Sequence, residues 1–370
     1  MRISFTASGN HVGGATMAMF NLMIGLLRLG HEPVLIATTP SKKYEDHFER
    51  LRKIGVEMHF TGTAHSGLTH WLRLASHALT NLNRYNIDLV HLHLPKEAAF
   101  LFYTLKSLHI PVVSTFEGDP FLEARFDVTF DKGIIIKVGS NLMAMADAVT
   151  ACSSWLAGRL GRVWNINVYA VPNPIDVERF LGIKEWCGSE KIVVALARLV
   201  PIKGIDVLVK AARRVSSECR DVRFIVAGEG PSKQELMGLI NKYGLREVFS
   251  LVGFISSPEN LLSKSYMVVM PSLYEPFGMP AAEAGAALRP VVASNTGGLA
   301  EIVIDGYNGF LARPGDPVDL ADKIIWLLEN EDVSKEMGRR GRVRVLENYT
   351  PVLVAKKYLE IYQRALNNSR

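Results

Sequence analysis

The strongest constraint on the fold of this chain is an alternation of strand and helix patterns that runs twice along its 370 residues. Short apolar runs, typical of buried strands, alternate with stretches that carry apolar side chains at helical spacing. In the first half, the expected strands are 3–7, 34–38, 89–92, 112–115, 149–151 and 168–171, and the clearest helices are 15–29 and 98–108. Repeated alternation of this kind predicts a parallel, doubly wound α/β sheet.

The pattern stops at Pro172-Asn173-Pro174 and restarts after Gly188. In the second half, the expected strands are 192–196, 223–227, 249–252, 267–270 and 290–293, and the expected helices are 204–215, 232–243, 280–287 and 317–329. The tail, 350–366, has the pattern of an amphipathic helix that begins with Thr350 and Pro351. The sequence therefore predicts two Rossmann-like domains joined by a proline-rich hinge.

Composition narrows the class of protein. With 48% hydrophobic and 21% charged residues, the chain is globular rather than disordered or collagen-like. Its three cysteines are widely spaced and form neither a disulfide framework nor a zinc signature, which favours a reducing compartment. We find no apolar run of membrane-spanning length and no signal peptide, so we expect a cytoplasmic protein, at most peripheral on the inner face of the membrane.

The charge distribution gives weaker information. Lys and Arg exceed Asp and Glu by 42 − 37 = 5, and the positive charges are dispersed. The densest group is Arg339, Arg340, Arg342 and Arg344, for which a solvated helix face is favoured over a nucleic-acid patch. The stretch 126–148 carries Lys132 and Lys137 beside apolar residues; core packing is favoured there over a membrane surface.

Loops that follow strands are the places to look for a site, because ligands of open α/β sheets bind beyond the carboxyl ends of strands. The first such loop contains Gly13 and Gly14 and leads into a helix. Paired glycines let the backbone approach a ligand, and the helix offers free amides to an anion, although a tight turn explains them equally well. The loop is not a G-x-G-x-x-G fingerprint, which disfavours a nicotinamide or flavin dehydrogenase.

The segment 274–283 is the richest in chemistry. Glu275 ends the loop after the expected strand 267–270, and Glu283 lies inside the next helix. Between them, backbone amides just ahead of the helix form a ready diphosphate site, at Phe277, Gly278 and Met279. The two carboxylates are suited to accept hydrogen bonds from sugar and ribose hydroxyls, although Glu283 also suits the helix dipole alone.

Two cations complete this arrangement. Arg198 and Lys203 follow the first strand of the second half and precede Gly204, which opens a helix. A guanidinium offers a planar fork to paired phosphate oxygens, and an ammonium adds a point charge. At this place in the pattern, a phosphate clamp is favoured over solvated surface.

Short motifs recur in a fixed order along the whole chain. In chain order they are Gly13-Gly14-Ala15, Gly30-His31-Glu32, Asp88-Leu89-Val90-His91-Leu92-His93, Asn173-Pro174-Ile175-Asp176, Arg198 to Lys203-Gly204, Gly228-Glu229-Gly230-Pro231, Glu275-x7-Glu283 and Gly297-Gly298 to Glu301. Each is weak alone, but their order and spacing together are specific. On these residues the chain resembles the large retaining glycosyltransferase family 4, which has the GT-B fold.

The resemblance implies an architecture and a reaction. Two Rossmann-like domains would face a central cleft: an acceptor-side domain, 1–172, to which a C-terminal helix at 349–370 crosses back, and a donor-binding domain, 173–348. The reaction would move a hexose from a UDP- or GDP-sugar, such as UDP-glucose or GDP-mannose, to a hydroxyl of a glycan, lipid or small molecule. No cofactor is obligatory in this family, no metal-binding motif is present at the expected place, and no nucleic-acid partner is implied.

The resemblance also implies roles for residues of the second domain. Arg198 and Lys203 would hold the diphosphate, with the amides of Gly14 and of 277–279 assisting. Glu275 would contact the sugar and Glu283 the ribose. The base would lie against a loop and a neighbouring strand end, at Gly228, Gly230 and Phe254.

One departure from the family pattern stands near the reacting carbon. Where the family usually has His followed by Gly, this chain has Glu117. The carboxylate would accept a sugar hydroxyl, stabilise an oxocarbenium-like transition state or serve as a base, or it would mark a lost activity; retained catalysis is favoured. His11 and Asp119 are the acceptor-side candidates. His91 and His93 lie on an expected strand, and we expect them to point to opposite faces.

Two alternatives remain from other classes. Glu117 motivates a non-catalytic nucleotide-sugar-binding protein, and the GT-B fold also occurs in sugar-nucleotide epimerases. An epimerase lacks the Glu275-x7-Glu283 arrangement, and a phosphorylase would need a pyridoxal lysine and a much longer chain. A glycosyltransferase is therefore the favoured interpretation.

Overall fold

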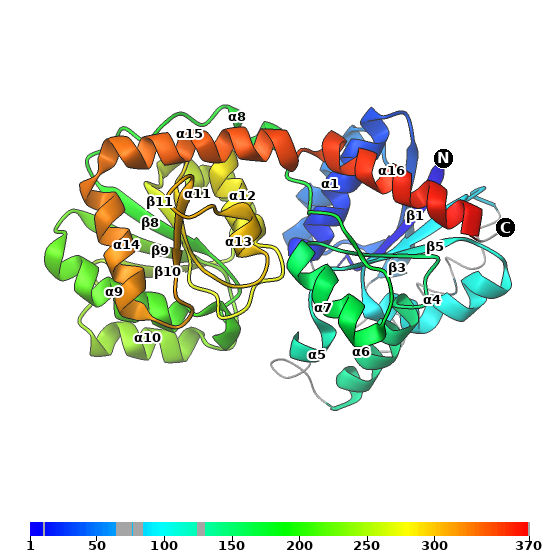
Figure 1. Ribbon diagram of the computed structural model, residues 1–370, viewed down its shortest axis with the longest axis horizontal. Helices are drawn as coiled ribbons and strands as arrows, with labels where there is room; N and C mark the ends of the chain where they lie inside the picture. The colour runs from blue at the N-terminus through cyan, green and yellow to red at the C-terminus, as the bar shows by residue number, and fades with distance from the viewer. Residues whose placement is uncertain (10–11, 64–75, 77–83, 124–129, 369–370) are drawn as a thin grey trace. The chain divides into compact units, whose positions relative to one another are not determined.

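The computed structural model describes residues 1–9, 12–63, 76, 84–123 and 130–368 of the chain. It divides into two compact units, one formed by 1–174 with 350–370 and the other by 175–349 (Figure 1). The chain therefore passes between the units twice, after Pro174 and after Tyr349. The division expected from the sequence, 1–172 with 349–370 and 173–348, differs from this one by at most two residues, 174 against 172.

The first unit is built on a seven-stranded parallel sheet in the order β3-β2-β1-β4-β5-β6-β7. The strands are β1 (Arg2–Ala7), β2 (Glu32–Thr39), β3 (Glu57–Thr63), β4 (Leu89–Leu92), β5 (Val112–Phe116), β6 (Ala148–Ala151) and β7 (Tyr169–Ala170). The helices are α1 (Gly14–Arg28), the 3-10 turn η1 (Lys42–Tyr44), α2 (Glu45–Lys53), α4 (Pro95–Ser107), α5 (Pro120–Glu123), α6 (Phe130–Met143), α7 (Ser154–Trp164) and α16 (Pro351–Asn368). The strand order reverses between β1 and β4, and such a switch point is where open α/β sheets bind ligands.

The second unit repeats the design with a six-stranded parallel sheet in the order β10-β9-β8-β11-β12-β13. Its strands are β8 (Lys191–Leu196), β9 (Val222–Ala227), β10 (Phe249–Gly253), β11 (Met267–Met270), β12 (Val291–Ser294) and β13 (Gly309–Ala312). Its helices are α8 (Glu178–Leu181), the 3-10 turn η2 (Pro201–Lys203), α9 (Ile205–Glu218), α10 (Lys233–Lys242), α11 (Pro258–Lys264), α12 (Met279–Ala286), α13 (Leu299–Ile302), α14 (Pro317–Glu329) and α15 (Glu331–Asn348). Here the order reverses between β8 and β11.

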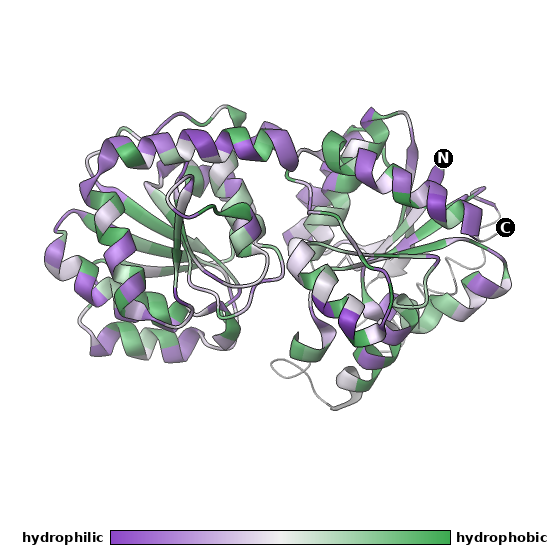
Figure 2. Ribbon diagram, in the orientation of Figure 1, coloured by the Kyte–Doolittle hydropathy of each residue, from purple (hydrophilic) through white to green (hydrophobic). Residues whose placement is uncertain are grey.

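Figure 2 shows that the strands of both units consist mostly of hydrophobic residues, whereas the helices carry hydrophobic and hydrophilic residues together. β4, β11 and β12 are buried at every residue, which is expected of parallel strands covered on both faces. α9 buries residues at helical spacing, among them Ile205, Leu208 and Val215. The parallel α/β fold class predicted from the alternation is therefore confirmed.

Three of the elements that the sequence pattern did not predict are an edge strand, a short strand and a helix that buries small residues. β3 lies at the edge of its sheet and is only partly buried, and β13 is short and begins at Gly309. α15 buries mostly small residues, namely Ser334, Met337, Gly338, Gly341 and Val345. Its Gly341 packs directly on Gly285 of α12, so close backbone contact replaces a hydrophobic stripe.

Two surface expectations are corrected by the structure. Arg339 pairs with Glu185 and Glu336 on the surface, but the Arg342 guanidinium donates to the carbonyls of Phe180, Ile183 and Ala286 and so ties α15 to α8 and α12. The expectation that the stretch 126–148 packs in the core is wrong for two residues of α6, because Ile134 and Val138 are 49% and 48% exposed. Among the described residues, no helix combines the length and the apolar character needed to cross a membrane.

The contact between α1 and α16 gives a stability prediction. Gly25 of α1 has no room for a side chain, because a Cβ there would lie 2.1 Å from the carbonyl oxygen of Pro351. We expect Gly25→Ala to lower the free energy of unfolding by about 1–3 kcal/mol, since the helices must separate. Gly238→Ala in α10, where nothing lies within 4 Å, should instead raise it by about 1 kcal/mol. Urea denaturation measures both, and equal effects would contradict the packing explanation.

Candidate active site

In the second unit, the loops that follow β8 and β11 lie directly on each other at the switch point. The amide of Leu273 donates to the carbonyl of Ile202 at 2.9 Å. Gly204 has φ +62°, and a Cβ there would lie 2.1 Å from the carbonyl oxygen of Pro271. Only glycine fits this contact, because it combines a left-handed conformation with a backbone in van der Waals range.

This contact brings Lys203 and Glu275 together. The Lys203 Nζ lies 2.7 Å from Oε2 of Glu275, and the Ser272 hydroxyl donates to the same oxygen at 3.3 Å. Glu275 is buried and Lys203 is half-buried, so their ion pair is shielded from water more than a surface pair would be. Sequence reasoning identified both charged residues but not Ser272.

Two further glycines, in the loop after β12, pack on the backbone of the segment that carries Glu275. A Cβ at Gly297 would lie 2.0 Å from the Glu275 carbonyl oxygen, and one at Gly298 would lie 2.3 Å from that of Pro276. The Gly298 amide donates to the Glu275 carbonyl at 2.9 Å. The loop after β12 is therefore packed on the segment that carries the carboxylate.

Arg198 is exposed, and a glycine loop holds its backbone in place. A Cβ at Gly228 would lie 1.8 Å from the Ala197 carbonyl oxygen, and one at Gly230 would lie 2.3 Å from that of Leu199. Gly228 and Gly230 therefore allow the loop after β9 to pack on the loop that carries Arg198. Contact of Gly228 and Gly230 with a nucleotide base stays a prediction.

Phe254 stands directly after β10 and is half-buried. The amide of Gly228 donates to the carbonyl of Gly253 at 2.8 Å, so the strand end that carries Phe254 is joined to the glycine loop. The structure therefore brings the three predicted base-contacting residues to neighbouring loops of one unit.

α12 begins beside Glu275, and its second residue, Pro280, has no amide hydrogen. Gly278 has φ +107°, and no side chain caps the helix. Phe277 is buried with its ring 5.7 Å from that of Tyr349, and Met279 is also buried. The first amides of a helix have no intrahelical acceptor, which suits this turn to binding an anion.

Glu283 lies within α12 in an environment that disfavours its charge. Loss of hydration raises the pKa of Glu283 to about 7, and the neighbouring Glu259 carboxylate adds to the rise while Arg179 opposes it. Arg179 of α8 is itself paired with Glu259 of α11. Nothing in the sequence pattern singled out Arg179 or Glu259.

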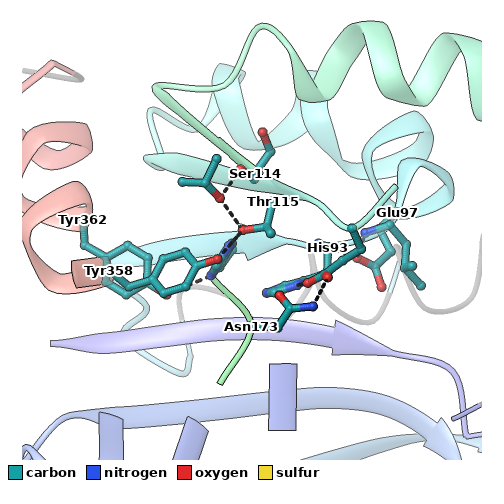
Figure 3. A network of polar contacts seen from close by, with 11 residues as sticks. His93, Glu97, Ser114, Thr115, Asn173, Tyr358 and Tyr362 are labelled. Atoms are coloured by element: carbon teal, nitrogen blue, oxygen red, sulfur yellow. Dashed lines mark hydrogen bonds and ion pairs between the residues drawn. The ribbon is translucent and has the colours of Figure 1, made fainter. Parts of the chain in front are cut away.

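In the first unit, Glu117 is held by the side chains of His93 and Asn173, which come from different segments and are labelled in Figure 3. Its Oε1 lies 3.3 Å from Nδ1 of His93, and its Oε2 accepts a hydrogen bond of 2.7 Å from Nδ2 of Asn173. His93 follows β4, Glu117 follows the adjacent β5 and Asn173 follows β7, so segments after three strands of one sheet meet here. Sequence reasoning assigned no role in the site to His93 or Asn173.

The expectation that His91 and His93 point to opposite faces is wrong. Residues two positions apart on a strand lie on the same face of the sheet, and the two imidazole centroids accordingly lie 4.3 Å apart. His91 bonds to the hydroxyls of Tyr362 and Thr115 at 2.8 and 2.6 Å. Burial lowers the pKa of His91 well below its ordinary value, so it is neutral and anchors α16.

Other candidates in the first unit have different outcomes. Gly13 and Gly14 begin α1, where no side chain caps the helix, and Gly14 is exposed. An acceptor-side role for Asp119 is not supported, because its buried carboxylate accepts from the amides of Phe121 and Leu122 and pairs with Arg159. It has no exposed oxygen for a ligand. His11 lies outside the described residues.

A buried carboxyl group supports the backbone of His93. Oε2 of Glu97 accepts hydrogen bonds from the amides of His93 and Leu94 at 3.3 and 3.2 Å. Loss of hydration raises the pKa of Glu97 to about 8, although these two bonds oppose the rise. In the part of the chain that the structure describes, no group of three or more His, Cys, Asp or Glu side chains is placed to hold a metal ion.

Comparison with known proteins gives one consistent result. The family model for glycosyl transferases group 1 matches residues 177–344, and that for glycosyltransferase family 4 matches 12–179. An uncharacterized glycosyltransferase of Methanocaldococcus jannaschii is 30% identical over 260 residues, which cover 69% of this chain and 70% of the relative. The N-acetyl-alpha-D-glucosaminyl L-malate synthase of Bacillus anthracis is 26% identical over 315 residues, 81% of this chain and 80% of that protein.

Solved structures agree on the fold. The crystal structure of Anabaena HepE in complex with UDP and glucose matches with a TM-score of 0.80 at 20% identity, and covers 98% of this chain and 99% of that one. The expected GT-B fold class is therefore confirmed.

Glu97 gives a prediction of pH dependence. In the folded chain its carboxyl group keeps its proton up to about pH 8, whereas the unfolded chain releases it near 4.5. The unfolded state thus loses the proton first, and the free energy of unfolding should fall between pH 4.5 and 8, by about 1.4 kcal/mol per pH unit at most from this group. Glu97→Gln should flatten this dependence in denaturation curves measured across that range.

The control for this prediction is Glu347→Gln, which changes an exposed carboxylate of α15. Glu283 contributes in the same direction, so Glu97→Gln should remove part of the slope and not all of it. An unchanged slope in Glu97→Gln would contradict the buried, protonated state.

Proposed function

This chain belongs to the family of glycosyl transferases group 1 and is a glycosyltransferase, and from that premise we propose that it is a retaining enzyme that moves a hexose from a nucleotide-diphosphate sugar to an acceptor hydroxyl. The observation that carries the proposal is the pair of Lys203 and Glu275 at the switch point of the second unit, beside the uncapped start of α12. One unit thus gathers an ammonium group, a carboxylate and the backbone amides just ahead of α12, which suit a diphosphate joined to a sugar.

The central task of the site is to stabilise the departing diphosphate. Negative charge develops on that group as the bond between it and the sugar carbon breaks, and cations placed in advance stabilise this charge most. Lys203 has three donor hydrogens and can keep its bond to Glu275 while it binds a phosphate oxygen. Arg198, on the loop that the glycines support, supplies a second cation. The amides of Gly14 and of 277–279 would assist.

The remaining contacts complete the donor site. Glu275 would accept hydrogen bonds from the sugar and Glu283 from the ribose, with the base near Gly228, Gly230 and Phe254. The donor would be a UDP- or GDP-sugar, such as UDP-glucose or GDP-mannose; the HepE structure that resembles this chain was solved with UDP and glucose. Because Arg198 and Lys203 supply the positive charge, no obligatory metal ion is part of the proposal.

The acceptor and the location belong to the same proposal. The acceptor would be a glycan, a lipid or a small molecule with a free hydroxyl, and the enzyme would work in the cytoplasm. A peripheral membrane contact is supported by α6, on which Ile134 and Val138 are exposed beside the exposed Lys137.

The first test removes the proposed stabilising charge. Lys203→Ala should lower kcat by about 10²–10³, a loss typical of removing one group that stabilises developing charge, with a smaller effect on donor binding. Lys242→Ala, an exposed lysine of α10, is the matched control and should leave kcat unchanged. Release of UDP or GDP from a panel of nucleotide sugars and acceptors measures both. The proposed function fails if the wild type binds nucleotide sugars but releases no nucleotide with any acceptor.

A second test uses the raised pKa of Glu283. The ionised carboxylate accepts hydrogen bonds from both ribose hydroxyls, and protonation removes part of that capacity. Because the pKa of Glu283 is about 7, affinity for UDP or GDP should rise between pH 6 and 8. Calorimetric titration of wild type and Glu283→Gln checks this, since the variant should lose the rise while keeping the pH effects of the nucleotide itself.

Arg179→Met sharpens this second test. It removes the positive charge that opposes the rise in the pKa of Glu283, so the pH-dependent rise in affinity should move to higher pH. The same pH dependence in wild type and Glu283→Gln would exclude contact between this carboxylate and the ribose.

A further inference from the structure

The cluster of His93, Glu117 and Asn173 is not used by the donor site of the second unit. It stands at the carboxyl edge of the first sheet, where His93 follows β4 at the switch point and Glu117 follows the adjacent β5. We propose that Glu117 is a fixed anionic hydrogen-bond acceptor for a sugar hydroxyl, and that His93 and Asn173 are the residues that position it. The ligand class rests on the proposed function, whereas the fixed anion rests on the geometry alone.

The first step concerns the proton between His93 and Glu117. Their Nδ1 and Oε1 atoms lie 3.3 Å apart, so one of them carries a hydrogen toward the other. An imidazole ring keeps a hydrogen on at least one nitrogen, and Nδ1 is the nitrogen that faces an acceptor, the carboxylate of Glu117. His93 is therefore the donor and Glu117 the acceptor.

The other nitrogen of His93 supports the same assignment. In the part of the chain that the structure describes, Nε2 is buried and has no hydrogen-bond partner. A hydrogen on Nε2 would be an unsatisfied buried donor, and a second hydrogen on the ring would add a buried charge as well. The neutral form with hydrogen on Nδ1 avoids both costs.

The second step concerns the orientation of the carboxylate. Asn173 donates to Oε2 at 2.7 Å, and its own segment is fixed on both sides. The carbonyl of Pro174 accepts from Nδ2 of Asn21 at 2.8 Å, and the amide of Val171 donates to the carbonyl of Ala151 at 2.9 Å. The donor that Asn173 presents is thus tied to both α1 and β6.

The imidazole of His93 is fixed in the same way. Its ring centroid lies 4.3 Å from that of His91 and 6.0 Å from that of Phe5, and its amide donates to Glu97 at 3.3 Å. His91 is neutral and is itself bonded to hydroxyl groups, so it brings no competing charge to the cluster.

These contacts decide between the roles open to Glu117. Each of its oxygens already accepts one hydrogen bond, so the donors of His93 and Asn173 are directed at the carboxylate from both sides. A base would have to take up a proton beside two donor hydrogens, whereas a hydrogen-bond acceptor uses lone pairs that remain on both oxygens. The side chain of Glu117 is 11% exposed and that of His93 is 4% exposed, so the carboxylate is the part that a ligand reaches. Acceptance from a hydroxyl is therefore favoured over proton removal.

The fixed anion is tested without any assay of activity. Long-range ¹H–¹⁵N spectra of histidine-labelled protein report which ring nitrogens carry hydrogen, and His93→Gln identifies the His93 signals by their loss. We expect hydrogen on Nδ1 and a bare Nε2, and a shift of the Nδ1 signal in Glu117→Gln. Hydrogen on Nε2 with a bare Nδ1 would overturn the proposal.

The contact with a hydroxyl is tested by variants that keep or remove the hydrogen-bonding atoms. Glu117→Gln keeps an acceptor oxygen and should lower kcat/KM about tenfold, whereas Glu117→Ala should lower it about a hundredfold or more. His93→Asn keeps a donor near the place of Nδ1 and should stay within a few-fold of wild type, unlike His93→Leu, which should lose about tenfold. Glu360→Gln, an exposed carboxylate of α16, is the control and should change nothing.

The outcomes separate this inference from the proposed function. Equal losses in Glu117→Gln and Glu117→Ala would overturn the acceptor role in favour of a base. If donor hydrolysis without acceptor falls together with transfer, the hydroxyl belongs to the donor sugar; if transfer alone falls, it belongs to the acceptor. A wild type that transfers from no nucleotide sugar refutes the proposed function, while the spectra still decide whether Glu117 is a fixed anion.

Discussion

Close contact between backbones is the constraint on which the candidate site depends. Charged side chains keep their positions only if the loops that carry them cannot move, and here glycines allow one loop to lie on the next. Gly204 on Pro271 and Gly297 on Glu275 leave no space for a Cβ, and the amide of Leu273 bonds to Ile202 across the same junction. The 2.7 Å pair of Lys203 and Glu275 follows from this packing. The motif glycines of the second unit, at 204, 228, 230, 297 and 298, are therefore explained by close backbone contacts within the protein.

The buried ionisable groups follow from the same packing. In each unit, the loops at the carboxyl edge of the sheet bury polar side chains. A buried ionisable side chain is stable only if it is paired with an opposite charge or is neutral. Lys203 and Glu275 are paired, and so are Asp119 and Arg159. Glu97 lacks an opposite charge, and its pKa rises to about 8, while the pKa of His91 falls well below its ordinary value.

Sequence patterns predicted the parts of the fold and the site that depend on local order. Apolar runs located most strands, and loops after strands located Lys203 and Glu275. Sequence patterns did not predict the side chains whose place in the site depends on contacts between segments that are distant in the sequence. The bond between Asn173 and Glu117 joins residues 56 positions apart. Asp119 has the composition of a site residue, yet its oxygens are taken by the amides of α5 and by Arg159, which no spacing rule reveals. His93 was misjudged because residues two positions apart on a strand share a face, which places its imidazole beside that of His91.

The departure at Glu117 has a physical explanation in this arrangement. The family pattern has an imidazole after the strand that is β5 here, and this chain has a carboxylate there. Parallel neighbours bring the residues after β4 and β5 together, so His93 places an imidazole beside the carboxylate from the adjacent strand. The two groups differ in what they offer a ligand, because an imidazole presents one donor or one acceptor and an ionised carboxylate presents only acceptors. Since His93 and Asn173 both donate to Glu117, the cluster offers a hydroxyl group lone pairs, and a ligand with a negative group at this point would be repelled.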